Sequence, residues 1–180
     1  IQDYPITYDD KLFFSYRVAD SIPVMYIFES DTNHAIKSVL ENDPLFKLTC
    51  SRLNNLDYSL LSRQNIVILE SLQQYSTGLV SELGKFSLNG KSIFIIPHKK
   101  LDAESYQELA LQLQIDAYSK TDTTSTKVST INLEDDFYEN VFEKIPQNID
   151  LPIINSHFKI NTKTANSVIE ILALKNGDSF

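Results

Sequence analysis

The sequence predicts an α/β fold, a three-layer sandwich built on a mainly parallel sheet. Two short runs, 66–69 and 93–96, contain only apolar residues, as strands covered on both faces do. The segment between them has apolar residues at helical spacing, at Leu79, Val80, Leu83 and Phe86. A helix that joins two buried strands makes them parallel, and the crossover is expected to be right-handed.

Three elements are predicted before this central unit. Residues 22–28 form an apolar strand, and residues 32–42 carry an amphipathic pattern that ends before Pro44. Residues 46–50 alternate between apolar and polar, which indicates a half-buried strand. In this strand Cys50 is expected to be a small core residue.

After the central unit, Asp102 is predicted to cap a third helix with an apolar stripe. Residues 119–130 are too polar for a core and are predicted to form a loop whose end continues as a strand. Residues 153–160 and 167–174 are interpreted as an antiparallel hairpin. The order of helices and strands before this tail favours a flavodoxin-like sheet, with the first and third strands adjacent.

The chain is interpreted as one domain over residues 1–180, a length that suits a single core. Its predicted parts are an N-terminal strand or linker, an α/β core, a polar loop and an irregular β-rich tail, at 1–18, 19–118, 119–130 and 131–180.

Composition excludes several function classes. The formal net charge of −8, without a large basic cluster, argues against nucleic acid as a partner. One cysteine excludes an internal disulfide and a cysteine-rich zinc site. No signal peptide or stretch long enough to span a membrane is visible. Because the chain begins at Ile1 rather than Met, we expect it to be part of a longer protein.

Several short motifs suggest a family. The central unit with its Asn89-Gly90 turn is one, and the others lie at residues 3–9, 13–16, 42–46, 55–58, 141–142 and 176–178. Together they resemble the soluble region of BatA-type membrane-anchored proteins, a family linked to aerotolerance. The resemblance implies a domain similar to class I glutamine amidotransferases. It also implies a periplasmic location, an anchor absent from this fragment, and protein partners in the cell envelope.

Polar residues follow the predicted parallel strands, where ligands bind in open α/β sheets. These candidate crevice residues are Glu29, Ser30, Asp31, Glu70, Ser71, His98 and Lys99. Carboxylates facing a histidine could perform acid–base chemistry or hold a cation. The competing interpretation is structural, because polar residues necessarily follow buried strands and Asp31 can cap a helix.

The machinery of an amidotransferase is missing from the sequence. No cysteine stands in a Gly-x-Cys-x-Gly turn, and no histidine is followed two residues later by glutamate. No glycine-rich phosphate loop is present, and His34 and His157 are expected to be surface or satisfied structural histidines. No catalytic residue, metal or cofactor is therefore assigned.

The leading hypothesis is a non-catalytic extracytoplasmic interaction domain, a degenerate relative of amidotransferases. One alternative is a hydrolase or amidotransferase relative that uses Glu70 and His98. A further alternative is a small-ligand sensor that uses the same crevice.

Overall fold

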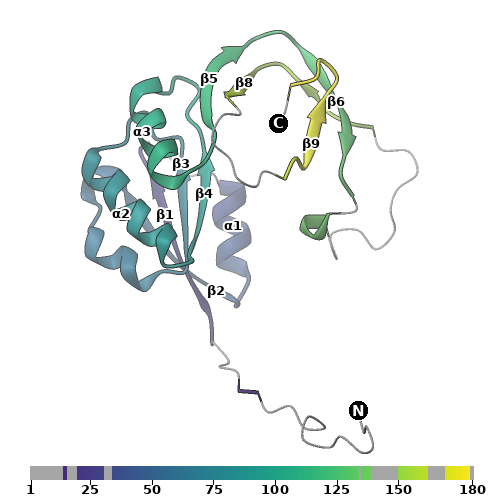
Figure 1. Ribbon diagram of the computed structural model, residues 1–180. Helices are drawn as coiled ribbons and strands as arrows, with labels where there is room; N and C mark the ends of the chain where they lie inside the picture. Colours follow the sequence, from purple (N-terminus) through teal and green to yellow (C-terminus); the bar gives the residue numbers. More distant parts are fainter. Residues whose placement is uncertain are drawn as a thin grey trace, which may run out of the picture.

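A four-stranded parallel sheet forms the centre of the computed structural model, which describes residues 14–15, 20–30, 34–133, 135–138, 150–161 and 169–178 (Figure 1). Its strands are β1 (Ile22–Phe28), β2 (Phe46–Arg52), β3 (Ile66–Glu70) and β4 (Ser92–Ile96), in the order β2-β1-β3-β4. All three pairings are parallel, so the predicted flavodoxin-like order and the neighbouring positions of the first and third strands are confirmed.

Helices cover both faces of this sheet. On one face α2 (Thr77–Leu88) and α3 (Ala103–Leu113) pack on a core that includes Ile27 and Leu69. On the other face lies α1 (His34–Asn42), above Val24, Tyr26 and Ile68. The first two crossover helices thus lie on opposite faces, as a reversal of strand order between them requires. The fold class is therefore an α/β three-layer sandwich with additional antiparallel strands.

Two helix caps locate the starts of α2 and α3. The hydroxyl oxygen of Ser76 accepts a hydrogen bond from the Leu79 N–H at 3.2 Å. The carboxylate of Asp102 accepts one from the Ser105 N–H at 2.9 Å. Each cap satisfies an amide of the first helical turn, which has no partner within the helix.

At strand β4 the structure differs from the prediction of burial on both faces. Its apolar run predicted burial on both faces, but Phe94 is 55% exposed, whereas Leu69 on the neighbouring strand β3 is fully buried. The reason is that β4 lies at the edge of the sheet and the short helix α1 covers only part of its face. Cys50 is a second correction: it is exposed on the opposite edge strand, β2, and does not belong to the core.

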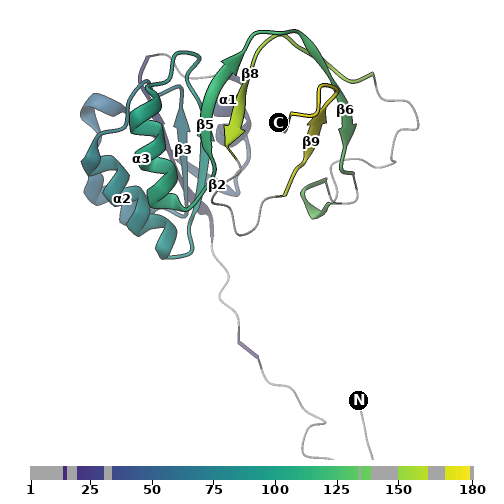
Figure 2. The same ribbon diagram turned by 45° about the horizontal axis from the view of Figure 1, so that its top comes forward.

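The C-terminal part contains two small antiparallel sheets (Figure 2). One pairs β5 (Ala117–Asp122) with β8 (His157–Asn161). In the other, β6 (Thr126–Ile131) pairs with both β7 (Ile153–Ile154) and β9 (Leu172–Leu174). The described residues also contain three short 3-10 helices: η1 (Leu53–Asn55), η2 (Tyr58–Arg63) and η3 (Asp136–Tyr138).

These pairings contradict two predictions. The stretch 119–130 is mostly strand, because polar side chains are acceptable on strands whose faces remain in solvent. The predicted hairpin of 153–160 with 167–174 is wrong, since its described strands pair with β5 and β6 instead. Burial of Val128 and Leu174 explains the pairing of β6 with β9, which local sequence does not specify.

A row of aromatic rings joins the β5–β8 sheet to the core. The ring centroids of Tyr75 and Tyr106 are 4.7 Å apart, and those of Tyr106 and Tyr118 are 5.9 Å apart. Tyr118 on β5 then meets Phe158 on β8 at 5.3 Å. Edge-to-face and tilted aromatic contacts of this kind fix the C-terminal strands against α3.

No helix among the described residues is both long enough and apolar enough to cross a membrane.

Candidate functional site

The strand order reverses between β1 and β3, and a pocket of about 380 Å³ lies at the carboxyl ends of these strands. Its lining comes from the end of β1, from η1 and η2, and from the loop before α2: Glu29, Leu53, Asn54, Tyr58, Gln74, Tyr75 and Ser76. We call it the switch-point pocket. It occupies the position at which open α/β sheets bind ligands.

Hydrogen bonds fix the walls of the switch-point pocket. A carboxylate oxygen of Glu29 accepts the backbone N–H of Gln73 at 2.8 Å, which ties the loop after β3 to the end of β1. The hydroxyl groups of Tyr58 and Ser76 are 3.3 Å apart. Glu29 therefore serves both as a loop anchor and as the charged group of the lining.

Glu70, the second predicted carboxylate, lies on the other face of the sheet. Its side chain is buried and accepts a hydrogen bond from the hydroxyl of Tyr26, which belongs to the core beneath α1. Since successive side chains of a strand alternate between faces, Glu29 and Glu70 end on opposite sides of the sheet. The two carboxylates do not converge.

Two of the remaining candidate residues, Ser71 and His98, form hydrogen bonds to the backbone. Ser71 follows β3 with a φ of +51°, and its N–H donates to the Ile96 carbonyl at 2.8 Å. The ring nitrogen Nδ1 of His98 accepts the N–H of Lys100 at 3.0 Å. Ser30 and Lys99 are exposed, and Asp31 lies outside the described residues.

Tyr106 fastens this edge of the sheet from α3. Its hydroxyl accepts the N–H of His98 at 3.2 Å and donates to the Leu72 carbonyl at 3.1 Å. A tyrosine hydroxyl is protonated at neutral pH, and burial raises the pKa of Tyr106 further, so this hydroxyl continues to donate. The loops after β3 and β4 are thus joined through one buried phenol.

The lining of the switch-point pocket holds no histidine and no cysteine among the described residues. Its serine, Ser76, already accepts the N–H of Leu79 and contacts the hydroxyl of Tyr58. A nucleophile needs an adjacent base that takes its proton, and no such pair is formed here. The pocket can therefore bind a ligand through polar and aromatic contacts, but it does not assemble a nucleophile with its base.

Glu29, a candidate from the sequence, lines the switch-point pocket together with two tyrosines that were not among the candidates. Tyr58 comes from η2, between β2 and β3, and Tyr75 from the loop before α2. Both loops follow strands of the parallel sheet. Their place after the carboxyl ends of these strands is the sequence feature that could have identified the two tyrosines as pocket residues.

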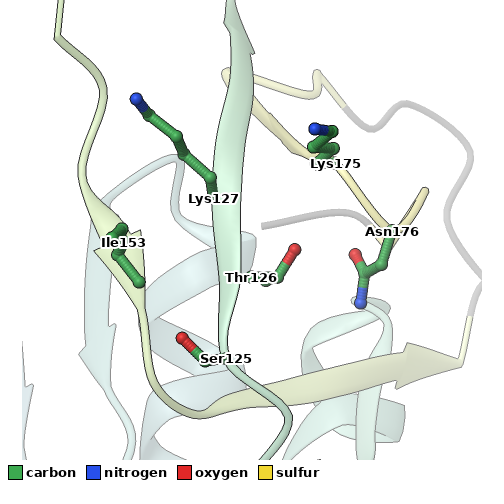
Figure 3. A pocket seen from close by; sticks show the side chains of 6 residues that line it. All are labelled: Ser125, Thr126, Lys127, Ile153, Lys175 and Asn176. Atoms are coloured by element: carbon green, nitrogen blue, oxygen red, sulfur yellow. The ribbon is translucent and has the colours of Figure 1, made fainter.

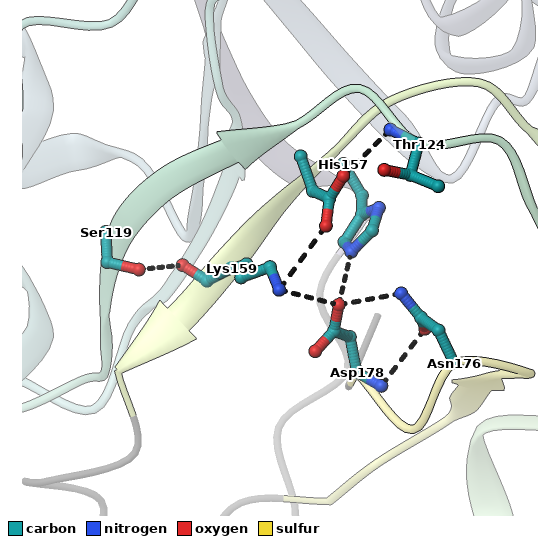
Figure 4. A network of polar contacts seen from close by, with 7 residues as sticks. Ser119, Thr124, His157, Lys159, Asn176 and Asp178 are labelled. Atoms are coloured by element: carbon teal, nitrogen blue, oxygen red, sulfur yellow. Dashed lines mark hydrogen bonds and ion pairs between the residues drawn. The ribbon is translucent and has the colours of Figure 1, made fainter.

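A second polar cluster, unforeseen from the sequence, lies in the C-terminal part (Figure 4). The ring nitrogen Nε2 of buried His157 is 2.9 Å from a carboxylate oxygen of Asp178. The ammonium of Lys159 lies 3.3 Å from Asp122 and 3.6 Å from Asp178. Hydrogen bonds from Thr124 and Lys159 lower the pKa of Asp122 to about 2, and those from His157 and Lys159 lower that of Asp178.

The same cluster has the residue types of a metal site. Ligand atoms of Asp122, His157 and Asp178 all lie within 4.8 Å of one another. Lys159, however, already places a positive charge beside both carboxylates, where a cation would otherwise lie. We interpret the cluster as an ion-pair network that joins β5, β8 and the turn after β9. His157 is therefore structural and buried, and its Nδ1 has no hydrogen-bond partner among the described residues.

Another hollow, of about 430 Å³, opens on the small sheet of β6, β7 and β9 (Figure 3). Lys127, on β6, extends toward Asp150, and their charged atoms are 3.0 Å apart. In Figure 3 the side chain of Lys175, in the turn after β9, lies on the opposite side of β6 from the ammonium of Lys127. Because the two ammonium groups do not converge, this hollow does not form an anion site.

No family model matches the chain, and neither does any curated protein. Among solved structures, a ThuA-like protein from Bacteroides uniformis is similar with a TM-score of 0.58 and 12% identity, over 91% of this chain and 72% of that one. A GMP synthase subunit from Thermoplasma acidophilum has a TM-score of 0.49 and 16% identity, over 88% and 76%. PurLQS from Thermotoga maritima has a TM-score of 0.46 and 16% identity, over 88% and 77%. The first of these likenesses is one of fold alone.

Proposed function

We propose that this chain is a non-catalytic interaction domain that binds a partner through the switch-point pocket and its rim. One observation carries the proposal: the polar groups at the carboxyl ends of the parallel strands hold neighbouring loops in place. Glu29 anchors Gln73, Tyr106 joins Leu72 to His98, and Glu70 pairs with Tyr26 on the opposite face. Groups used in this way preserve the shape of a binding surface.

The proposed location is the extracytoplasmic part of a membrane-anchored protein. Its support is the resemblance of residues 3–9, 42–46 and 55–58 to the soluble region of BatA-type proteins. In that family the soluble region contains a domain similar to class I glutamine amidotransferases, so the domain would be a degenerate relative of those enzymes. Proteins of the cell envelope would then be its partners.

A small-ligand sensor is the second candidate function. The volume of the switch-point pocket, about 380 Å³, favours it, because pockets of this size enclose small molecules. The difference between the two candidates is the size of the occupant, since the same lining residues would serve both.

Location is tested with the single cysteine of the chain. The thiol of Cys50 is exposed, so a membrane-impermeant maleimide is expected to label the full-length protein in intact spheroplasts. Burial of part of the side chain raises the pKa of Cys50, and labelling is therefore best performed in mildly alkaline buffer. Labelling that appears only after the spheroplasts are lysed would place the domain in the cytoplasm, and Cys50→Ala controls for other thiols.

The same thiol separates the non-catalytic proposal from the amidotransferase alternative. We expect no glutamine hydrolysis, and only slow reaction of Cys50 with a glutamine-analogue electrophile, unaffected by added glutamine. Cys50→Ala is expected to leave the fold and binding unchanged, because the side chain lies on an exposed edge strand. Rapid stoichiometric modification of Cys50 that glutamine prevents would establish a catalytic site and overturn the proposal.

A further inference from the structure

We propose that the switch-point pocket binds the cationic end of a basic side chain, lysine or preferably arginine, presented by a partner protein. This inference rests on the proposed interaction function and specifies the chemistry of its partner.

The charge of the pocket lining favours a cation. Glu29 is the charged residue of the lining, and the lining contains no lysine, arginine or histidine. Asp57 precedes Tyr58 but does not line the pocket, and the positive charge of Arg63 offsets part of its negative charge, so the charge of the pocket is set by Glu29. A cation therefore meets net attraction at this mouth, whereas a phosphate or carboxylate meets repulsion.

The ring of Tyr58 offers an aromatic surface that also favours a cation. Tyr58, at the pocket, is 38% exposed, so part of its side chain is open to a ligand. The face of a tyrosine ring attracts a cation, and a planar guanidinium also stacks on it. An arginine could thus lie against Tyr58 while it donates hydrogen bonds to Glu29, a geometry that a compact ammonium satisfies less well.

The amino end of α2 opposes the binding of a cation, because its partial charge is positive. The helix dipole places about half a positive charge there, and Ser76 lies in the pocket wall at this end. Ser76 already caps the Leu79 N–H, which satisfies part of that end. The full negative charge of Glu29 exceeds the remaining partial charge, so the balance favours a cation.

The pocket is tested by titrating the folded protein with N-acetyl-arginine amide and following the backbone amide signals by NMR. The matched neutral ligand is N-acetyl-citrulline amide, which replaces the guanidinium by a urea of nearly the same shape. We expect the signals of residues 73–76 and 58 to shift with the arginine probe at millimolar concentrations. The citrulline probe is expected to bind about tenfold more weakly, a difference of about 1.4 kcal/mol.

Glu29→Gln is the decisive variant. The amide oxygen of glutamine can still accept the Gln73 N–H, so the loop keeps its anchor while the negative charge is lost. We expect Glu29→Gln to weaken arginine binding about tenfold, equivalent to about 1.4 kcal/mol. Glu108→Gln on the exposed side of α3 makes the same change of charge outside the pocket and is expected to leave binding unchanged.

Three results would overturn the inference. They are equal binding of the arginine and citrulline probes, unchanged binding by Glu29→Gln, and no shift of the pocket signals at tens of millimolar arginine probe. None of them bears on the non-catalytic proposal, whose failure is a glutamine-protected reaction of Cys50.

Discussion

Replacing Tyr106 by phenylalanine is expected to lower the free energy of unfolding by about 2–4 kcal/mol, although only one oxygen atom is removed. That oxygen accepts the His98 N–H and donates to the Leu72 carbonyl, and the hydroxyl of Tyr75 lies 3.4 Å away. Tyr106 is only 3% exposed, so water cannot readily replace the lost partner. The measurement is urea unfolding followed by far-UV circular dichroism.

The matched control for this substitution is Tyr118→Phe. Tyr118 belongs to the same row of aromatic rings, but its hydroxyl makes no hydrogen bond within the described part of the chain. We expect a loss below about 1 kcal/mol, because the ring and its packing are retained. Equal losses for the two variants would mean that the hydroxyl of Tyr106 does not hold the loops after β3 and β4.

Leu69→Ala is expected to cost about 3–5 kcal/mol. Leu69 is fully buried on β3 within the core formed by α2 and α3, and truncation leaves a cavity that the rigid strands on either side cannot fill. Lost transfer free energy and lost packing both contribute to this cost. Chemical denaturation of the variant gives the value directly.

Phe94→Ala on the neighbouring strand β4 is the comparison for Leu69→Ala. Although phenylalanine is larger than leucine, Phe94 is 55% exposed and its removal is expected to cost about 1 kcal/mol or less. The two runs look alike in the sequence, so the pair of substitutions tests which strand is central. A cost for Phe94→Ala as large as that for Leu69→Ala would mean that β4 is covered on both faces.

The parallel sheet could be predicted because its pattern is local. The apolar run at 66–69, the helical spacing up to Phe86 and the cap at Asp102 each specify an element. A helix between two strands then determines their direction. The C-terminal strands have no comparable signal, because β6 is polar on its exposed face. Its pairing with β9 depends on the burial of a residue far along the chain, Leu174.

The sequence could predict where the switch-point pocket lies, but not which side chains line it. The carboxyl ends of the strands identified Glu29, but whether a side chain faces α1 or α2 depends on register, which separates Glu29 from Glu70. Tyr58 and the network of His157 with Asp178 depend on contacts between segments far apart in the chain. Patterns within one segment carry no information about such contacts.

The pairing of β5 with β8 has a consequence for synthesis of the protein. Ala117 pairs with Asn161, and Val128 pairs with Leu174, so these sheets need contacts between segments widely separated in the chain. Such contacts form late, because the entropy of closing a long loop is lost before any stabilising contact is made. On the ribosome the parallel sheet can be complete while Tyr118 still lacks its cover from Phe158. A nascent chain stalled at that point exposes an unpaired strand edge beside aromatic surface, which is the kind of surface that chaperones shield.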